Sequence, residues 1–336
     1  MKAWSRLVAL LSTKEHPRVL ALFRIALGLC AVYTIGTVML HGVVDDVWMD
    51  VADGGYRHLT RGNFLVQWLG GTSPQMVWGM SITALVASIA MTLGLGGRFT
   101  VFLTLWTVTA ATDFNSQASG SYDELLSSAI FLLLLGRPTQ TFSLDSRIRR
   151  GRFIDHTPIY AFPRWMALFQ LVLVYWATGM QKLSFYWVPG GEWSALYYIL
   201  QQPSWQRWDM SWVAYIYPLT QVMTGLTWFW EVGAPLLLLA FWYRHTRQRP
   251  GRLRRAFNRI DFRGIYALIG IGLHLSVFAT MEVGPFSWVS LSYYLCFFSP
   301  DEYHRAWQRL MRALGRAPDT DVAVVEPAKE AVDPPH

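Results

Sequence analysis

The feature that most constrains this chain is a series of apolar segments, most of them long enough to cross the hydrocarbon core of a bilayer. Because a backbone in lipid has to satisfy its hydrogen bonds internally, the segments predict an all-α, multi-pass transmembrane helical bundle. The third, fourth and eighth segments are short and polar enough to suit tilted, enclosed or re-entrant helices as well. We expect about eight spans, near residues 18–40, 76–96, 98–113, 121–136, 162–182, 219–242, 264–282 and 286–299.

The composition favours the same class of protein. Of the 336 residues, 53% are hydrophobic and 15% are charged, against about 25% charged residues in an average soluble domain. The 17 Trp, 15 Tyr and 19 Phe residues suit the aromatic belts that anchor spanning helices among lipid headgroups. Cys30 and Cys296 lie in apolar segments and match no metal or redox spacing, so we predict no disulfide framework and no metal site.

Basic residues indicate the orientation of the bundle, because Lys and Arg near the ends of spans are retained on the cytoplasmic side. With eight spans and a cytoplasmic N-terminus, all 29 basic residues except Arg57, Arg61, Lys182 and Arg207 fall on that side. We therefore expect a multi-pass protein of the plasma (inner) membrane with both termini cytoplasmic. The net charge of +7 then reflects topology and attraction to anionic lipid, and nucleic acid is not an expected partner.

The segments outside the spans predict the domain organisation. Residues 1–14 suit an amphipathic helix at the membrane interface, residues 15–310 form the transmembrane domain, and residues 311–336 have the composition of a disordered cytoplasmic tail. Residues 41–75 and 183–212 are too long for simple turns, so we expect structured caps on the outer side, above an outward-facing cavity. Ser194–Gln202 suits an interfacial helix.

Ionisable side chains within spans are costly, so each is a candidate functional group with a structural alternative. Arg24 lies near the start of the first span, where snorkelling to the cytoplasmic surface explains it. A hydrogen bond to a neighbouring helix would explain Glu231, and a hydrogen-bonded position in the core would explain His274. Asp123 and Glu124 begin the fourth predicted span, where helix capping alone accounts for carboxylates.

Lys182 follows Tyr175-Trp-Ala-Thr-Gly-Met-Gln at the far end of the fifth predicted span. A lysine acts as a general base only when it is neutral, and desolvation favours the neutral form. Neighbouring Trp and Tyr residues offer such surroundings. The alternative, an ammonium that snorkels to water at the outer surface, stays open.

The Lys182 segment, with Trp187-Val188 after it, is one of several motifs that occur in a fixed order along the chain. The set resembles the membrane domain of vitamin K-dependent gamma-glutamyl carboxylase over about residues 15–310. The chain is thereby similar to the horizontally transferred transmembrane (HTTM) domain family, to which that carboxylase belongs. The other motifs are Ser143-Leu-Asp145, Trp230-Glu231-Val-Gly-Ala-Pro235, His274 with Gly284-Pro-Phe286, and Phe298-Ser299-Pro300.

The resemblance implies a quinol-dependent carboxylase of the carbon–carbon lyase type. Lys182 would be the base that activates a reduced naphthoquinone, a cofactor like vitamin K hydroquinone, with O2 and CO2 as co-substrates. Tyr122 stands where the family has a catalytic histidine, with Asp123 beside it, so both join Lys182 as catalytic candidates. Gln181 replaces the first lysine of the family pair. The candidate cofactor-binding residues are Glu231, His274 and Trp187.

Two other functions stay open. Bacterial proteins of this group include maturation factors for a small secreted peptide, in which the same cavity would hold the peptide without catalysis. Glu231 and His274 could instead serve a proton-coupled transporter or a lipid-binding protein. Besides the lipid bilayer we expect a secreted peptide as partner. The two caps or another protein would recognise it, because the large luminal region of the animal enzyme has no counterpart here. The oligomeric state is open.

Overall fold

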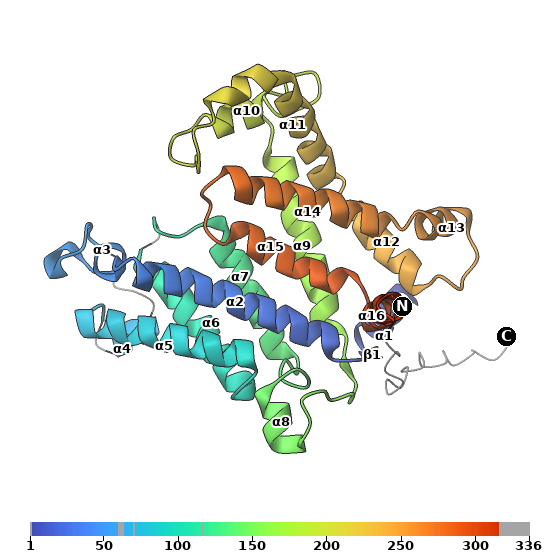
Figure 1. Ribbon diagram of the computed structural model, residues 1–336, viewed down its shortest axis with the longest axis horizontal. Helices are drawn as coiled ribbons and strands as arrows, with labels where there is room; N and C mark the ends of the chain where they lie inside the picture. The colour runs from blue at the N-terminus through green and yellow to red at the C-terminus, as the bar shows by residue number, and fades with distance from the viewer. Residues whose placement is uncertain (1, 60–63, 70, 116, 316–336) are drawn as a thin grey trace. The chain divides into compact units, whose positions relative to one another are not determined.

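The computed structural model describes residues 2–59, 64–69, 71–115 and 117–315, and these residues are mostly helical (Figure 1). The chain divides into two compact units, which we describe separately. The first comprises residues 1–166 and 298–336, and the second comprises residues 167–297. The tail predicted at 311–336 lies outside the described residues from residue 316 onward.

In the first unit, the first four predicted apolar segments form the helices α2, α5, α6 and α7, which pack against one another. Helix α2 contacts α5 and α7, and α6 contacts α5 and α7 (Figure 1). A two-stranded antiparallel ladder pairs Lys14 with Tyr160. The elements are α1 (Lys2–Leu11), β1 (Lys14–Glu15), α2 (Arg18–Leu40), α3 (Val44–Trp48), η1 (Val51–Asp53), α4 (Phe64–Trp68), α5 (Pro74–Leu93), α6 (Gly97–Phe114), α7 (Ser121–Leu135), α8 (Leu144–Arg150), β2 (Ile159–Tyr160) and α16 (Pro300–Ala313).

Helix α9 (Phe162–Gln181) begins in the first unit and continues into the second. In the second unit, α14 contacts α11, α12 and α15, and α10 packs on α11. The helix predicted at Ser194–Gln202 forms as α10, and its place at the membrane interface stays a prediction. The remaining elements are α10 (Ala195–Leu200), η2 (Ser211–Ile216), α11 (Tyr217–Val232), α12 (Pro235–His245), α13 (Arg252–Arg259), α14 (Phe262–Thr280), α15 (Phe286–Tyr294) and η3 (Leu295–Phe297).

Three helices of the described residues, α2, α5 and α14, are long and apolar enough to cross a membrane. A fourth crossing follows if the bent pair of Ser211–Val232 and Pro235–His245 counts as one span. The protein is therefore a helical membrane protein. Helices α6, α7, α9 and α15 coincide with the other predicted segments, and their crossing of the membrane stays a prediction.

The span predicted at residues 219–242 is broken in the structure, because the helices on either side of residues 233–234 are bent by 55°. Pro235 begins α12, and proline has no N–H with which to continue the hydrogen bonds of a preceding helix. Helix α11 ends at Val232, and the N–H of Gly233 donates to the carbonyl of Phe229 at 2.9 Å. The break places Glu231 in the last turn of α11.

Arg24 does not snorkel to the surface as predicted, because its side chain is fully buried in the first unit. Its guanidinium donates to the carbonyl of Pro138 at 3.2 Å and to that of Phe142 at 2.6 Å. Gly94 has a φ of +71°, and a Cβ there would collide with Arg24 and Ser143. The close approach of Gly94 thus encloses Arg24, which holds the loop after α7.

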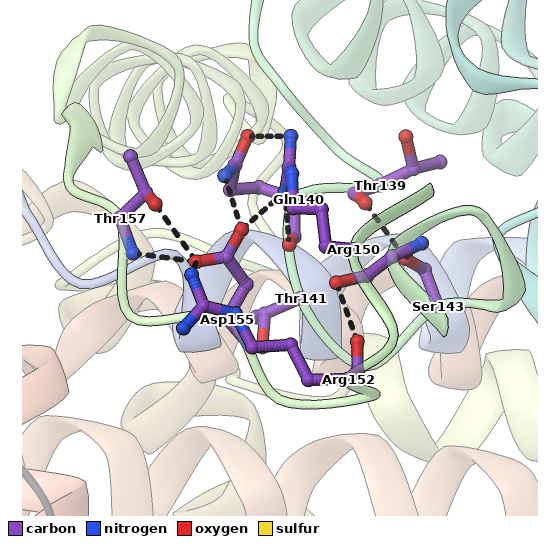
Figure 2. A network of polar contacts seen from close by, with 9 residues as sticks. Thr139, Gln140, Thr141, Ser143, Arg150, Arg152, Asp155 and Thr157 are labelled. Atoms are coloured by element: carbon purple, nitrogen blue, oxygen red, sulfur yellow. Dashed lines mark hydrogen bonds and ion pairs between the residues drawn. The ribbon is translucent and has the colours of Figure 1, made fainter. Parts of the chain in front are cut away.

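A buried carboxylate organises the rest of that loop, as Figure 2 shows. Asp155 accepts hydrogen bonds from Gln140 at 2.8 Å and from the hydroxyl of Thr157 at 2.8 Å, and it pairs with Arg150 and Arg152. Burial alone would raise the pKa of Asp155, but the hydrogen bonds from Thr157 and the charges of Arg150 and Arg152 outweigh it and lower the pKa. The ionised carboxylate therefore stabilises this loop.

A pair of histidines, of which His16 is buried and His156 partly buried, lies next to the start of α2. His16 Nε2 lies 3.0 Å from Nδ1 of His156, and the backbone N–H of Arg18 donates to Nδ1 of His16 at 3.1 Å. An imidazole that accepts at Nδ1 is neutral and carries its proton on Nε2. Burial, helped by the charges of Arg18, His156 and His304, lowers the pKa of His16 to about 4.

This pair predicts loss of thermal stability in mild acid. The unfolded chain binds a proton at His16 below about pH 6.5, whereas the folded chain binds it only near pH 4. The unfolding temperature therefore falls as the pH drops from about 6.5 to 4. Thermal unfolding of the detergent-purified protein across this range measures the effect. His16→Gln flattens the fall, and His58→Gln, at a site with a side chain 87% exposed, does not. An equally steep fall in His16→Gln would contradict the assignment.

Candidate functional site

The candidate site is an ion pair between Lys182, directly after α9, and Glu231, in the last turn of α11. Lys182 Nζ donates to Oε2 of Glu231. The side chains are only 22% and 11% exposed, respectively. Gly179 makes the pair possible, because a Cβ there would lie 2.8 Å from Glu231 Cβ and 2.9 Å from the backbone nitrogen of Val232. The two helices therefore approach closely where the charges meet.

An aromatic ring covers the ammonium. Trp187 lies on the turn after α9, where its N–H donates to the carbonyl of Ser184 at 2.9 Å. Lys182 Nζ lies 5.0 Å from the centre of the Trp187 ring, within the range of a cation–π contact. The structure thus brings together three of the residues singled out in the sequence: Lys182, Glu231 and Trp187.

Two apolar neighbours of the pair in the sequence are exposed. Leu183, the neighbour of Lys182, is 73% exposed, and Phe229, two residues before Glu231 in α11, is 60% exposed. The Phe229 ring packs on Trp193 with a centroid distance of 5.9 Å. Trp193 has a φ of +55°, a strained conformation for a bulky residue, and such strain is often found at functional sites.

His274 belongs to a second, buried polar cluster of the same unit. Tyr175 Oη lies 2.8 Å from His274 Nε2 and 3.2 Å from Tyr294 Oη. The Tyr175 ring also packs on Trp230, with a centroid distance of 4.4 Å. Among the described residues no group hydrogen-bonds to His274 Nδ1, although the residue is only 5% exposed. His274 is therefore a core histidine with one ring nitrogen satisfied.

The two clusters share their helices. Tyr175 lies in α9 and Lys182 directly follows that helix seven positions later, about two helical turns or 10 Å further along its axis. Trp230 and Glu231 are consecutive in α11. The sequence identified Lys182 and Glu231 but not the roles of Tyr175 and Tyr294. The seven-residue spacing between Tyr175 and Lys182 was the signal that could have pointed to Tyr175.

Tyr122 and Asp123, the other catalytic candidates, belong to the first unit. Asp123 is 6% exposed, and its carboxylate accepts the N–H of Gly120 at 2.8 Å. This bond caps the start of α7. Helix capping was the predicted alternative to a catalytic role for Asp123. Tyr122 is partly buried beside the same turn. Their catalytic assignment stays a prediction, as does that of Lys182.

The ion pair is suited to acid–base chemistry. A lysine and a carboxylate in direct hydrogen-bond contact can exchange a proton, and partial burial strengthens their interaction. In the part of the chain that the structure describes, no group of His, Cys, Asp and Glu side chains could hold a metal ion.

Comparison with known proteins adds one finding. The family model described as HTTM domain matches residues 13–201, more than half of the 336 residues. The matched range includes Lys182 and Trp187 but ends before Glu231 and His274. No curated protein and no solved structure matches the chain.

Proposed function

Because this chain belongs to the HTTM domain family, we propose that it is a quinol-dependent membrane enzyme. In this proposal Lys182 is the base that takes a proton from a reduced naphthoquinone. The observation that supports it most is the direct contact between Lys182 and Glu231, half-enclosed beneath Trp187. The link between HTTM domains and the membrane domain of vitamin K-dependent carboxylases suggests the naphthoquinone class of cofactor.

The chemistry of the residues fits such a cofactor. A naphthoquinol has a flat apolar ring and a hydroxyl that donates a hydrogen bond. Trp187 offers aromatic surface, and Lys182 and Glu231 offer nitrogen and oxygen acceptors once a proton has moved between them. When bound, the reduced quinone would supply the electrons that reduce O2, and a secreted peptide is the proposed carboxyl acceptor.

The proton follows a short path in this proposal. A paired ammonium has no lone pair, so the proton of Lys182 first passes across the hydrogen bond to Oε2 of Glu231. Lys182 Nζ, now neutral, accepts the proton of the quinol hydroxyl and becomes an ammonium again. The net result is one proton moved from the hydroxyl to Glu231. Trp187 shields the exchange from water, which keeps the electrostatic interactions strong.

The test is oxygen-dependent epoxidation of a reduced naphthoquinone by the purified protein. Loss of a general base costs about 100-fold or more in rate, so we expect Lys182→Ala to lose at least that much. Lys182→Arg loses as much, because a guanidinium stays protonated. Lys14→Ala, which removes an exposed lysine of the first unit, keeps the parent rate.

Two results would contradict the proposal. Epoxidation at the parent rate in folded Lys182→Ala would exclude Lys182 as the base. A folded parent protein that binds the quinone but forms no epoxide would favour a non-catalytic role, such as peptide maturation.

A second candidate function is proton-coupled transport, which the break between α11 and α12 favours. Transporters place ion sites at discontinuous helices, and Glu231 lies in the last turn before the 55° bend. Internal acidification of proteoliposomes under a proton gradient, abolished by Glu231→Gln, would support this function. Proton impermeability of the parent protein would exclude it.

A further inference from the structure

Helix α13 (Arg252–Arg259) is attached to the second unit by one side only. Asn258 donates to the carbonyl of Tyr243 at 3.0 Å, and the Phe257 ring packs on Tyr243 at a centroid distance of 5.5 Å. The guanidinium of Arg254 lies 5.2 Å from the centre of the same tyrosine ring. These three residues therefore form the side of α13 that faces the end of α12.

A second side of α13 is an exposed apolar stripe. Leu253 is 65% exposed and Ile260 is 55% exposed, with exposed Ala256 between them. At 100° per residue the three positions share one face of the helix, which continues through Ile260 as the C-cap. A soluble loop would not need such a stripe, so it calls for an apolar environment.

A basic stripe lies directly beside the apolar one. Arg252, Arg255 and Arg259 are exposed and share the adjacent face. Among the described residues none of the three guanidiniums is paired with a carboxylate. Residues 244–261 contain seven Arg and one acidic residue, Asp261, and Asp261 itself pairs with Arg263 at 3.0 Å. The face therefore has a positive charge that no protein group neutralises in the described part of the chain.

The position of α13 in the chain indicates which surroundings offer both an apolar environment and anions. Helix α14, which is long and apolar enough to span a membrane, begins at Phe262, three residues after α13 ends. A segment so close to the end of a span lies at the level of the lipid headgroups. At that level acyl chains can contact the apolar stripe, and headgroup phosphates can bind the basic stripe. A nucleic acid would offer phosphates for the basic stripe but no apolar surface for the other.

We propose that α13 lies in the membrane surface and binds anionic phospholipid. Arg252, Arg255 and Arg259 contact the headgroup phosphates, and Leu253 and Ile260 enter the boundary of the acyl chains. Binding of this kind fixes the connection between α12 and α14, and it is independent of the quinol chemistry proposed above.

The experiment places an environment-sensitive nitrobenzoxadiazole label on Ala256→Cys in the full-length protein. The native cysteines, Cys30 and Cys296, are both buried, and unsubstituted protein measures any labelling at them. The protein is reconstituted into nanodiscs of phosphatidylcholine alone or with added phosphatidylglycerol. We expect emission about twofold brighter and shifted to the blue with phosphatidylglycerol, and partial reversal in high salt.

Two triple variants of equal charge make the test specific. Arg252→Gln, Arg255→Gln and Arg259→Gln together abolish the difference between the lipids. Arg305→Gln, Arg309→Gln and Arg312→Gln together remove three exposed arginines of α16 and leave the difference intact. Equal emission in both lipids, or a lipid difference that survives the α13 triple variant, would overturn the proposal.

Discussion

We expect Lys182→Met combined with Glu231→Leu to abolish epoxidation while restoring most of the stability that either single variant loses. Each single variant leaves a largely buried charge without its partner. The cost lies between that of an exposed pair and that of a fully buried pair, about 2 kcal/mol. The double variant removes both charges, so the two losses are not additive. Activity does not return, because no base remains.

Thermal unfolding in detergent, with epoxidation measured on the same samples, gives the complete cycle. Glu282→Leu is the matched control, because Glu282 pairs with Arg207 in the same unit but its side chain is 57% exposed. We expect a loss below about 1 kcal/mol there. Additive losses in the double variant would show that Lys182 and Glu231 do not interact, which would remove the basis of the proposed proton path.

The second large effect is expected at Arg24. Arg24→Met leaves the carbonyls of Pro138 and Phe142 without their donor inside the first unit. Loss of a buried charged donor costs about 3 kcal/mol or more, so we expect a large drop in the unfolding temperature and in the yield of folded protein. Arg24→Lys recovers only part of this, because one ammonium replaces a planar group that reaches two carbonyls.

Arg149→Met is the control for this variant, because Arg149 is exposed on α8. Its change removes one positive charge at little cost in stability. Unfolding of Arg24→Met at the parent temperature would mean that the loop after α7 is held by other contacts.

The helices could be predicted because their signals are local. The length of the apolar segments identified α2, α5 and α14. Both ends of α5 are also marked locally: Ser73 caps its start, Pro74 is its first residue, and Gly94 ends it in the left-handed conformation. Pro235 is an equally local signal of the break before α12, but the apolar side chains on both sides of it favour one continuous span. The buried state of Arg24 was not predictable, because its acceptors lie more than 110 residues away in the sequence.

The candidate site could be predicted only in part for the same reason. The cost of an ionisable group within an apolar segment marked Lys182, Glu231 and His274 individually. That Lys182 meets Glu231 rather than His274 depends on Gly179, whose missing side chain allows α9 and α11 to touch. Such packing between distant segments leaves no periodic signal. Asp123 differs from these residues, because its position at the start of a predicted helix already indicated the capping role that the structure shows.

The most direct measurement is protection of Lys182 from acetylation by a naphthoquinone. The chain has four lysines, at positions 2, 14, 182 and 329, so mass spectrometry can follow each one separately in the full-length protein. If the Lys182 and Glu231 pair is where the quinone binds, added naphthoquinone slows acetylation of Lys182 and leaves that of Lys14 unchanged. Acetylation of Lys182 at the same rate with and without saturating naphthoquinone would contradict the assignment of the site.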